Sequence, residues 1–120
     1  MSRNILVIED NEQNMYLVTF ILEAHDYHVL QAQTGREGLA LAKENPIDLI
    51  LLDIQLPELD GYAIAKMIRE VDSLKNIPMI AVTSYAMSGD REKALESGCT
   101  GYIEKPINPD TFMKEVQNFL

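Results

Sequence analysis

The stretch that decides the fold is Asp-Leu-Ile-Leu-Leu-Asp-Ile-Gln-Leu-Pro-Glu-Leu-Asp-Gly, residues 48 to 61. Residues 49 to 52 form an apolar run that is too short for a helix and is bounded by acids, which predicts a strand buried on both faces of a parallel sheet. Asp53 stands where this strand ends, at the edge where open α/β sheets place their ligands. Pro57 and Gly61 mark the loop into the next helix. On this stretch alone, Asp53 indicates either a chemical site or an acid that merely ends a strand.

The composition is that of one acidic domain. The chain has 120 residues, of which 47% are apolar, so we expect residues 1–120 to form a single domain with one core. Lys and Arg number 10 and Asp and Glu 19, a net charge of −9, which argues against nucleic-acid binding. Cys99 is the single cysteine, which suits a reducing compartment. Since no apolar run reaches membrane-spanning length and no signal peptide precedes the first strand, we expect a soluble, cytoplasmic protein without a membrane partner.

Short aliphatic runs and longer amphipathic segments alternate along the rest of the chain. We expect strands at 5–8, 27–32, 49–52, 79–82 and 101–104. We expect helices at about 12–24, 35–44, 64–71 and 86–97, with Gly98 ending the fourth, and a last helix that starts at Asn108-Pro109. Such alternation with short connections implies right-handed crossovers. The sequence therefore predicts a flavodoxin-like (βα)5 doubly wound fold, with a five-stranded parallel sheet in the order 2-1-3-4-5.

Three acids follow the first and third strands. In the predicted strand order these strands end side by side, so Glu9, Asp10 and Asp53 should meet in one crevice. Two carboxylates about 4 Å apart repel by about 1 kcal/mol in water and about 4 kcal/mol at an effective dielectric constant of 20. Three together need a cation or a shifted protonation. Oxygen ligands without imidazole or thiolate select a hard ion, and Mg²⁺ would also accept the backbone carbonyl of Gln55.

Two further polar side chains leave neighbouring strands in the same direction. Thr83 follows the fourth strand and Lys105 follows the fifth. A metal ion, an ammonium and a hydroxyl around one carboxylate form a site for three phosphoryl oxygens, in which Asp53 would be the attacking nucleophile. These residues therefore predict an aspartyl phosphate.

With these residues the chain resembles a known family, the receiver domain of two-component response regulators, from Asn4 to Leu120. The resemblance rests on the acid pair, the acceptor, the hydroxyl and the lysine, each at a strand end, and on an aromatic residue three positions before the lysine; the residues are Glu9-Asp10, Asp53 with Pro57 and Gly61, Thr83, Tyr102 and Lys105-Pro106. Asn11, Asn14 and Ile107 add a likeness to stand-alone receivers of the DivK type and to the receivers of hybrid histidine kinases.

The resemblance implies a role for each site residue. Asp10 and Asp53 would bind Mg²⁺, for which Mn²⁺ can substitute, through their side chains. Gln55 would bind the ion through its backbone carbonyl and Glu9 through a water molecule. Lys105 would pair with the phosphoryl group, and its bond to Pro106 is often cis in this family.

The resemblance also implies how the signal leaves the site. Thr83 would move to hydrogen-bond the phosphoryl group, and Tyr102 would turn inward behind it. The surface of the fourth helix, fifth strand and fifth helix would change and so control a downstream protein. Gln55 and Tyr85 stand where the family varies, so the lifetime of the phosphoryl group stays open.

The function implied is a signalling switch that takes its phosphoryl group from a histidine kinase or a histidine phosphotransfer protein. It would catalyse only its own phosphorylation and slow dephosphorylation, so we expect no enzyme in the usual sense. The apolar flank of the first helix, Leu17, Phe20 and Ile21, indicates either a well-buried helix or part of the kinase-docking face.

Three other functions are compatible with parts of this pattern. A phosphohydrolase of the haloacid-dehalogenase type needs a second acid two residues after its nucleophile, where this chain has Gln55. A flavin-binding module needs a phosphate loop after the first strand, where Glu9-Asp10 would repel the flavin phosphate. A receiver-like interaction module that is never phosphorylated stays open on the sequence alone.

Overall fold

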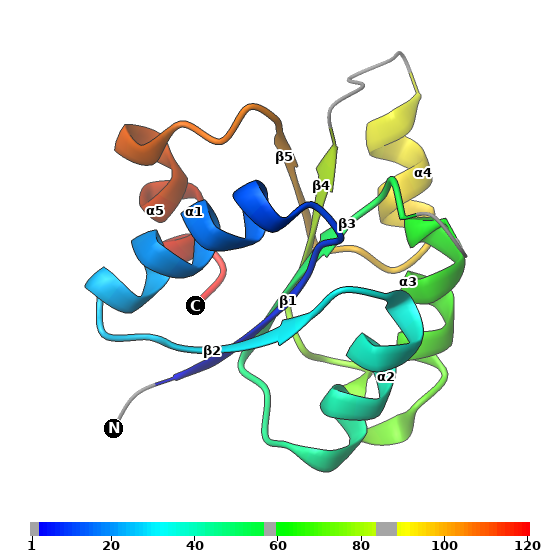
Figure 1. The fold of residues 1–120 in the computed structure, drawn as a ribbon. Helices are drawn as coiled ribbons and strands as arrows, with labels where there is room; N and C mark the ends of the chain where they lie inside the picture. Colours follow the sequence, from blue (N-terminus) through cyan, green and yellow to red (C-terminus); the bar gives the residue numbers. More distant parts are fainter. Residues whose placement is uncertain (1–2, 57–59, 84–88) are drawn as a thin grey trace.

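The computed structural model describes residues 3–56, 60–83 and 89–120, and its ribbon is drawn in Figure 1. Five parallel strands form one sheet in the order β2-β1-β3-β4-β5. The strands are β1 (Asn4–Ile8), β2 (His28–Ala32), β3 (Leu49–Asp53), β4 (Met79–Thr83) and β5 (Gly101–Glu104). The predicted flavodoxin-like fold and its strand order are therefore confirmed.

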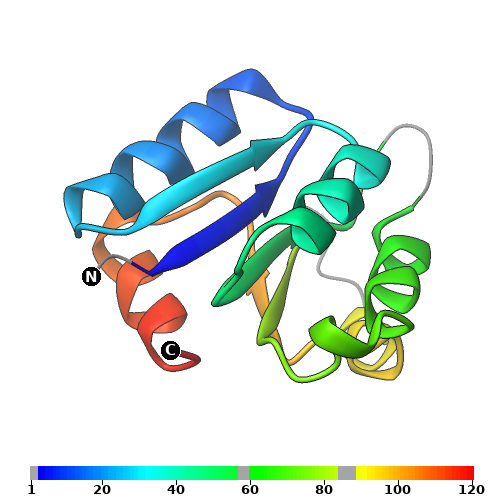
Figure 2. The same cartoon turned by 90° about the horizontal axis from the view of Figure 1, so that it is seen from below.

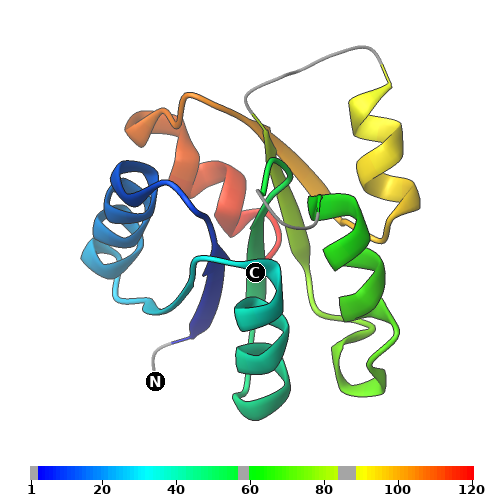
Figure 3. The same cartoon turned by 45° about the vertical axis from the view of Figure 1, so that its right-hand side comes forward.

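Helices cover both faces of this sheet. They are α1 (Glu12–Ala24), α2 (Gly35–Glu44), α3 (Gly61–Arg69), α4 (Asp90–Glu96) and α5 (Pro109–Gln117). Figures 2 and 3 show α1 and α5 on one face and α2, α3 and α4 on the other. In the described part of the chain, no helix is both long enough and apolar enough to cross a lipid bilayer.

Each face of the sheet has its own hydrophobic core. On the face covered by α1 and α5, Leu22, Leu51 and Phe112 are almost completely buried. On the other face, Leu52, Ile64 and Ile68 are completely buried. All five residues of β3 are buried, because a central strand of a parallel sheet has helices above and below it. The strand that carries Asp53 is thus held on both faces.

Polar caps set the beginnings of several helices. The side chains of Asn11, Thr34, Asp60 and Asn108 accept hydrogen bonds from backbone N–H groups in the first turns of α1, α2, α3 and α5. Gly61, the first residue of α3, lies against the strand end that carries Asp53. A Cβ atom at this position would be only 2.4 Å from the Cα of Ile54, so glycine allows the chain to pack close to the end of β3.

The third helix differs from the prediction, and the structure describes the fourth only from Asp90. Helical spacing extends to Val71, but α3 ends at Arg69 and a 3-10 turn, η1 (Asp72–Leu74), follows. The apolar side chain of Val71 still packs against the core, which explains its place in the pattern. In the described residues α4 begins at Asp90; the predicted start at 86 and the predicted loop residue Pro57 lie outside them. Gly98 ends α4 with a φ of +105°, as expected for a glycine after a helix.

Candidate functional site

The first residues after β1 and β3 bring three carboxylates together. Leu52 pairs with Ile8 in the parallel register of β3 and β1, so the residues that follow lie side by side. Carboxylate oxygens of Glu9, Asp10 and Asp53 all lie within 4.8 Å of one another. Glu9 and Asp53 are buried, whereas Asp10 is exposed to solvent. The structure thus brings together the acids that the sequence placed at these two strand ends.

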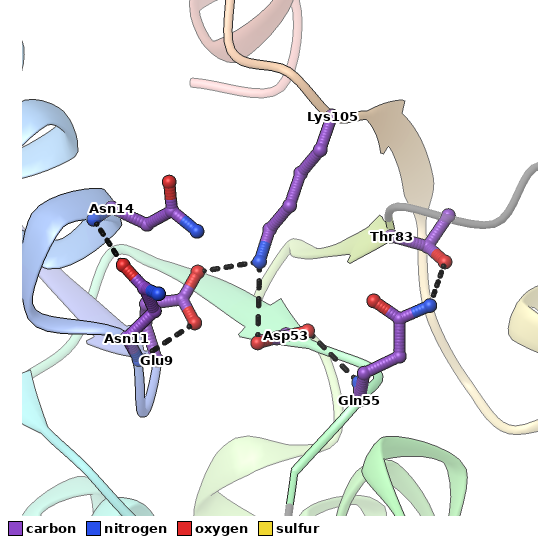
Figure 4. Close-up of polar contacts among 7 residues, drawn as sticks. All are labelled: Glu9, Asn11, Asn14, Asp53, Gln55, Thr83 and Lys105. Carbon is purple, nitrogen blue, oxygen red and sulfur yellow. Dashed lines mark hydrogen bonds and ion pairs between the residues drawn. The ribbon is translucent and has the colours of Figure 1, made fainter.

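Lys105 enters this acidic group from the end of β5. Its Nζ atom lies 2.8 Å from Oε1 of Glu9 and 3.3 Å from Oδ2 of Asp53 (Figure 4). The Lys105 backbone N–H donates to the carbonyl oxygen of Thr83 at 2.7 Å, and the bond between Lys105 and Pro106 is cis, as the resemblance implied. The ammonium therefore bridges two of the three carboxylates.

The charges in this group perturb one another. Burial, the hydrogen bond with Asp53 and the charge of that carboxylate together raise the pKa of Glu9 to about 7, against the opposing effect of Lys105. Burial alone would lower the pKa of Lys105, but its hydrogen bond to Glu9 and the charges of Asp53 and Glu9 outweigh burial and raise it. Three carboxylates facing one ammonium leave an excess of negative charge.

The composition of the site fits a hard divalent cation. Its donors are carboxylate oxygens from three residues whose atoms lie close enough to share one ion. Gln55 lies beside them, since its backbone N–H donates to Oδ1 of Asp53 at 2.8 Å. An exposed Asp10 leaves one side of the group open to water. Such a site can hold a metal ion that keeps several water ligands, which is the habit of Mg²⁺.

Thr83 and Tyr102 lie on the neighbouring strands. Thr83 is the last residue of β4 and is 2% exposed, and its hydroxyl oxygen accepts a hydrogen bond from Nε2 of Gln55 at 3.1 Å. Tyr102 is a half-buried residue of β5, where it pairs with Ala81 and packs against the core beneath α3 and α4. Tyr85, the other position expected to affect phosphoryl lifetime, lies outside the described residues.

Two contacts in the site were not predicted. The backbone N–H of Asn11 donates to Oε2 of Glu9 at 3.3 Å, while its side chain accepts from the N–H of Asn14 and caps α1. Asn11 therefore connects the start of α1 to the acidic group, and an asparagine directly after an acid pair is the sequence signal for this arrangement. The bond from Gln55 to Thr83 had no signal in the sequence, because it depends on how two side chains turn.

The outer surface of α1 carries an aromatic pair. Tyr16 and Phe20 are 72% and 62% exposed, and their rings stack with centroids 6.3 Å apart. Leu17 is half-buried beside them. Ile21, which the sequence placed on the same flank, is instead buried in the core against the sheet. The exposed apolar surface of α1 therefore consists of Tyr16, Leu17 and Phe20.

Comparison with known proteins agrees with this architecture. The model of the response regulator receiver domain family matches residues 5–117. The polar-differentiation response regulator DivK of Brucella anthropi is 42% identical over 120 residues, which is 100% of this chain and 98% of DivK.

Two solved structures extend the comparison. The receiver domain of the sensor histidine kinase PA1611 from Pseudomonas aeruginosa, solved with a magnesium ion coordinated in its active site cleft, is 32% identical with a TM-score of 0.91, covering 99% of this chain and 98% of the other. The receiver domain of Ssk1 from Saccharomyces cerevisiae, solved with the histidine phosphotransfer protein Ypd1, is 30% identical with a TM-score of 0.90, covering 98% of this chain and 88% of the other. This chain thus belongs to the response regulator receiver domain family of two-component signalling.

Proposed function

We propose that the domain is a phosphorylation-dependent switch that receives a phosphoryl group on Asp53 from a phosphohistidine. The observation that supports this function most strongly is the placement of the Lys105 ammonium 3.3 Å from Asp53, inside a group of three carboxylates. Like charges held this close oppose folding, so they contribute little as a structural device. They suit a reaction in which charge is transferred to one of them.

The chain's own residues supply the nucleophile and its surroundings. An oxygen of Asp53 forms a bond to phosphorus while the bond between phosphorus and the donor's imidazole nitrogen breaks. The imidazole leaves with the electron pair of that bond and takes up a proton. The N–H of Gln55 orients the carboxylate by its bond to Oδ1. Lys105, which lies at Oδ2, is placed to pair with a phosphoryl oxygen.

We propose that Asp10, Asp53 and the backbone carbonyl of Gln55 hold Mg²⁺, with Glu9 acting through a water molecule. The bound ion would neutralise negative charge on the phosphoryl oxygens. Mn²⁺ would substitute because it takes the same oxygen ligands. The oxygen-only donor set supports this assignment, as does the magnesium ion in the cleft of the PA1611 receiver.

The proposed output is a change at the surface of α4, β5 and α5. Thr83 would turn its hydroxyl to the phosphoryl group and Tyr102 would move inward behind it, so that a downstream protein binds differently. Tyr102 packs on the α3 and α4 side of the sheet, which supports this direction of transmission. The domain would turn over no separate substrate, and slow attack by water on the acyl phosphate would reset it.

A histidine kinase or a histidine phosphotransfer protein is the proposed phosphoryl donor. The Ssk1 receiver, solved with Ypd1, supports such a partner. We place part of the docking surface on the exposed apolar surface of α1, where Tyr16, Leu17 and Phe20 lie in the helix that follows Glu9 and Asp10. The net charge of −9 argues against a nucleic-acid partner. The single cysteine suits the reducing cytoplasm, where we propose that the domain works.

Intact-mass measurement after incubation with Mg²⁺ and a small acyl phosphate tests the proposed chemistry. Wild type should gain one phosphoryl group, whereas Asp53→Asn and wild type with a chelator should not. Asparagine keeps the shape of the acceptor and removes its nucleophilic charge, so it is a matched control. No adduct on wild type, or an equal adduct on the variant, would instead favour a receiver-like interaction module that is not regulated by phosphorylation.

A further inference from the structure

The side chain of Gln55 connects the proposed phosphoryl acceptor to the proposed switch residue. Its backbone N–H donates to Oδ1 of Asp53 at 2.8 Å, and its side-chain Nε2 donates to Oγ1 of Thr83 at 3.1 Å. Figure 4 shows both bonds on the side of Asp53 that faces away from Lys105. One residue, two positions after the acceptor, therefore contacts both the carboxylate and the hydroxyl.

We propose that Gln55 is a positioning residue that restrains the Thr83 hydroxyl in the unphosphorylated domain. Its carboxamide then sets how readily Thr83 turns to a phosphoryl group on Asp53. The inference rests on the proposed function, because it concerns the regulation of that same site.

The backbone of Thr83 is held by its neighbours, so the hydroxyl changes direction mainly by rotation about χ1. Thr83 pairs with Glu104 in the parallel register of β4 and β5, and its carbonyl oxygen accepts the N–H of Lys105. A β-branched side chain occupies a small number of separate χ1 positions rather than a continuum. A hydrogen bond that favours one of these positions therefore disfavours the others.

Burial makes this bond effective. Thr83 is 2% exposed, so water does not readily replace the Gln55 amide when the bond is broken. The hydroxyl oxygen accepts from Gln55, so this bond does not use the proton of the hydroxyl. The bond therefore leaves the hydroxyl able to donate and restrains only its direction. A phosphoryl group must overcome this restraint, which lowers the apparent affinity of the site for that group.

Gln55→Met is the variant that isolates the side-chain bond. Methionine has nearly the same length and no N–H donor, and the substitution leaves the backbone N–H and carbonyl of residue 55 in place. Thr83→Val removes the hydroxyl and keeps the branched shape. The two single variants and the double variant form a thermodynamic cycle that separates the bond from other effects of each substitution.

The probe is beryllium fluoride with Mg²⁺, a non-covalent mimic of a phosphoryl group on a carboxylate. Its dissociation constant is measured by calorimetry for wild type, the two single variants and the double variant. Mg²⁺ affinity is measured in parallel, because a change at the backbone carbonyl of Gln55 would alter Mg²⁺ binding and could be mistaken for a change in probe binding. Gln55→Met should bind the probe about 2- to 10-fold more tightly than wild type, the factor of one hydrogen bond. In the Thr83→Val background the same substitution should change the affinity less than about 1.5-fold.

A second measurement uses neither metal nor probe. Three-bond couplings to the Thr83 methyl carbon report its χ1 angle in the metal-free protein. Wild type should show a single χ1 position, and Gln55→Met should show averaging over at least two.

Three results would overturn this inference and leave the proposed function standing. They are unchanged or weaker beryllium fluoride binding by Gln55→Met, the same gain in affinity in the Thr83→Val background, and identical Thr83 couplings in wild type and Gln55→Met. Wild type that binds no beryllium fluoride would overturn the proposed function, and the inference with it.

Discussion

Lys105→Met removes the ammonium from between two buried carboxylates and keeps the length of the side chain. The Lys105 side chain is 10% exposed, and those of its partners Glu9 and Asp53 are 6% and 3% exposed. Breaking a fully buried ion pair costs about 3–5 kcal/mol, because the remaining charge loses its partner. Asp10 is exposed and admits water to one side of this group. We therefore expect the free energy of unfolding to fall by about 2–3 kcal/mol near neutral pH without divalent ions.

The ion pair between Lys75 and Asp72 offers a matched control. Its N–O distance is 2.9 Å, almost the same as between Lys105 and Glu9, but the side chains are 57% and 93% exposed. Exposed pairs contribute less than about 1 kcal/mol because water screens them. Lys75→Met should therefore lower the free energy of unfolding by no more than about 0.5 kcal/mol. The difference between the two variants measures the effect of burial at nearly constant distance.

Urea denaturation followed by circular dichroism, in the presence of a chelator, measures both losses. Adding Glu9→Gln to Lys105→Met should restore much of the stability, because it removes one of the charges left without a partner. The conclusion that burial makes the Lys105 charge important for stability is wrong if Lys105→Met and Lys75→Met lower the free energy of unfolding equally. It is also wrong if the double variant is no more stable than Lys105→Met.

Phe20→Glu should slow phosphotransfer from a phosphohistidine donor several-fold, while labelling by a small acyl phosphate stays the same. Met67→Glu is the control, because Met67 is also exposed but lies on the opposite face of the sheet. Equal transfer rates for the two variants would remove α1 from the docking surface. Raising the pH from about 9 to about 11 should cost wild type up to about 2–3 kcal/mol more stability than Cys99→Ala. Burial raises the pKa of the Cys99 thiol to about 11 in the folded protein, so the unfolded chain loses the thiol proton at a lower pH and is stabilised relative to the folded state. If wild type and Cys99→Ala lose the same stability over this pH range in urea denaturation, this account is wrong. Gly61→Ala should lower the free energy of unfolding by about 1–3 kcal/mol and slow acyl-phosphate labelling, because the new Cβ would lie 2.4 Å from the Cα of Ile54; a melting temperature equal to that of wild type would show that the loop yields instead.

The regular elements could be predicted because their signals are local. The apolar run at 49–52 became the fully buried β3. The capping residue Thr34 indicated where α2 begins, and Asn45-Pro46 indicated where it ends. The turn η1 was missed because it has no periodicity of its own. It is held by contacts outside the turn itself, since Leu74 is buried in the core and its carbonyl oxygen accepts a hydrogen bond from the guanidinium of Arg69 at 2.7 Å. A contact made by the far end of an arginine leaves no pattern in the residues that it stabilises.

The members of the candidate site could be predicted, but their contacts could not. Parallel strands end at one edge of a sheet, so strand order alone brings Glu9, Asp53 and Lys105 together. Which oxygen Lys105 approaches, and that Gln55 reaches Thr83, depend on side-chain rotation in a crowded space. Ile21 was assigned to the exposed flank for a related reason. A helix with apolar residues on two sides does not indicate which side meets the sheet.

The rigidity of the sheet explains how so much negative charge is kept together and how it can be used. β1 and β3 are buried on both sides and paired in register, so repulsion between Glu9 and Asp53 cannot move their backbones apart. Burial, and to a lesser extent the contact with Asp53, raise the pKa of Glu9 to about 7, and the ammonium of Lys105 offsets part of the negative charge by bridging the two carboxylates. Because the backbones are fixed, a change of charge on Asp53 must move side chains instead, namely those of Lys105, Gln55 and Thr83. Thr83 and Lys105 extend from the ends of β4 and β5. This is the physical reason to expect the domain to respond near β4 and β5.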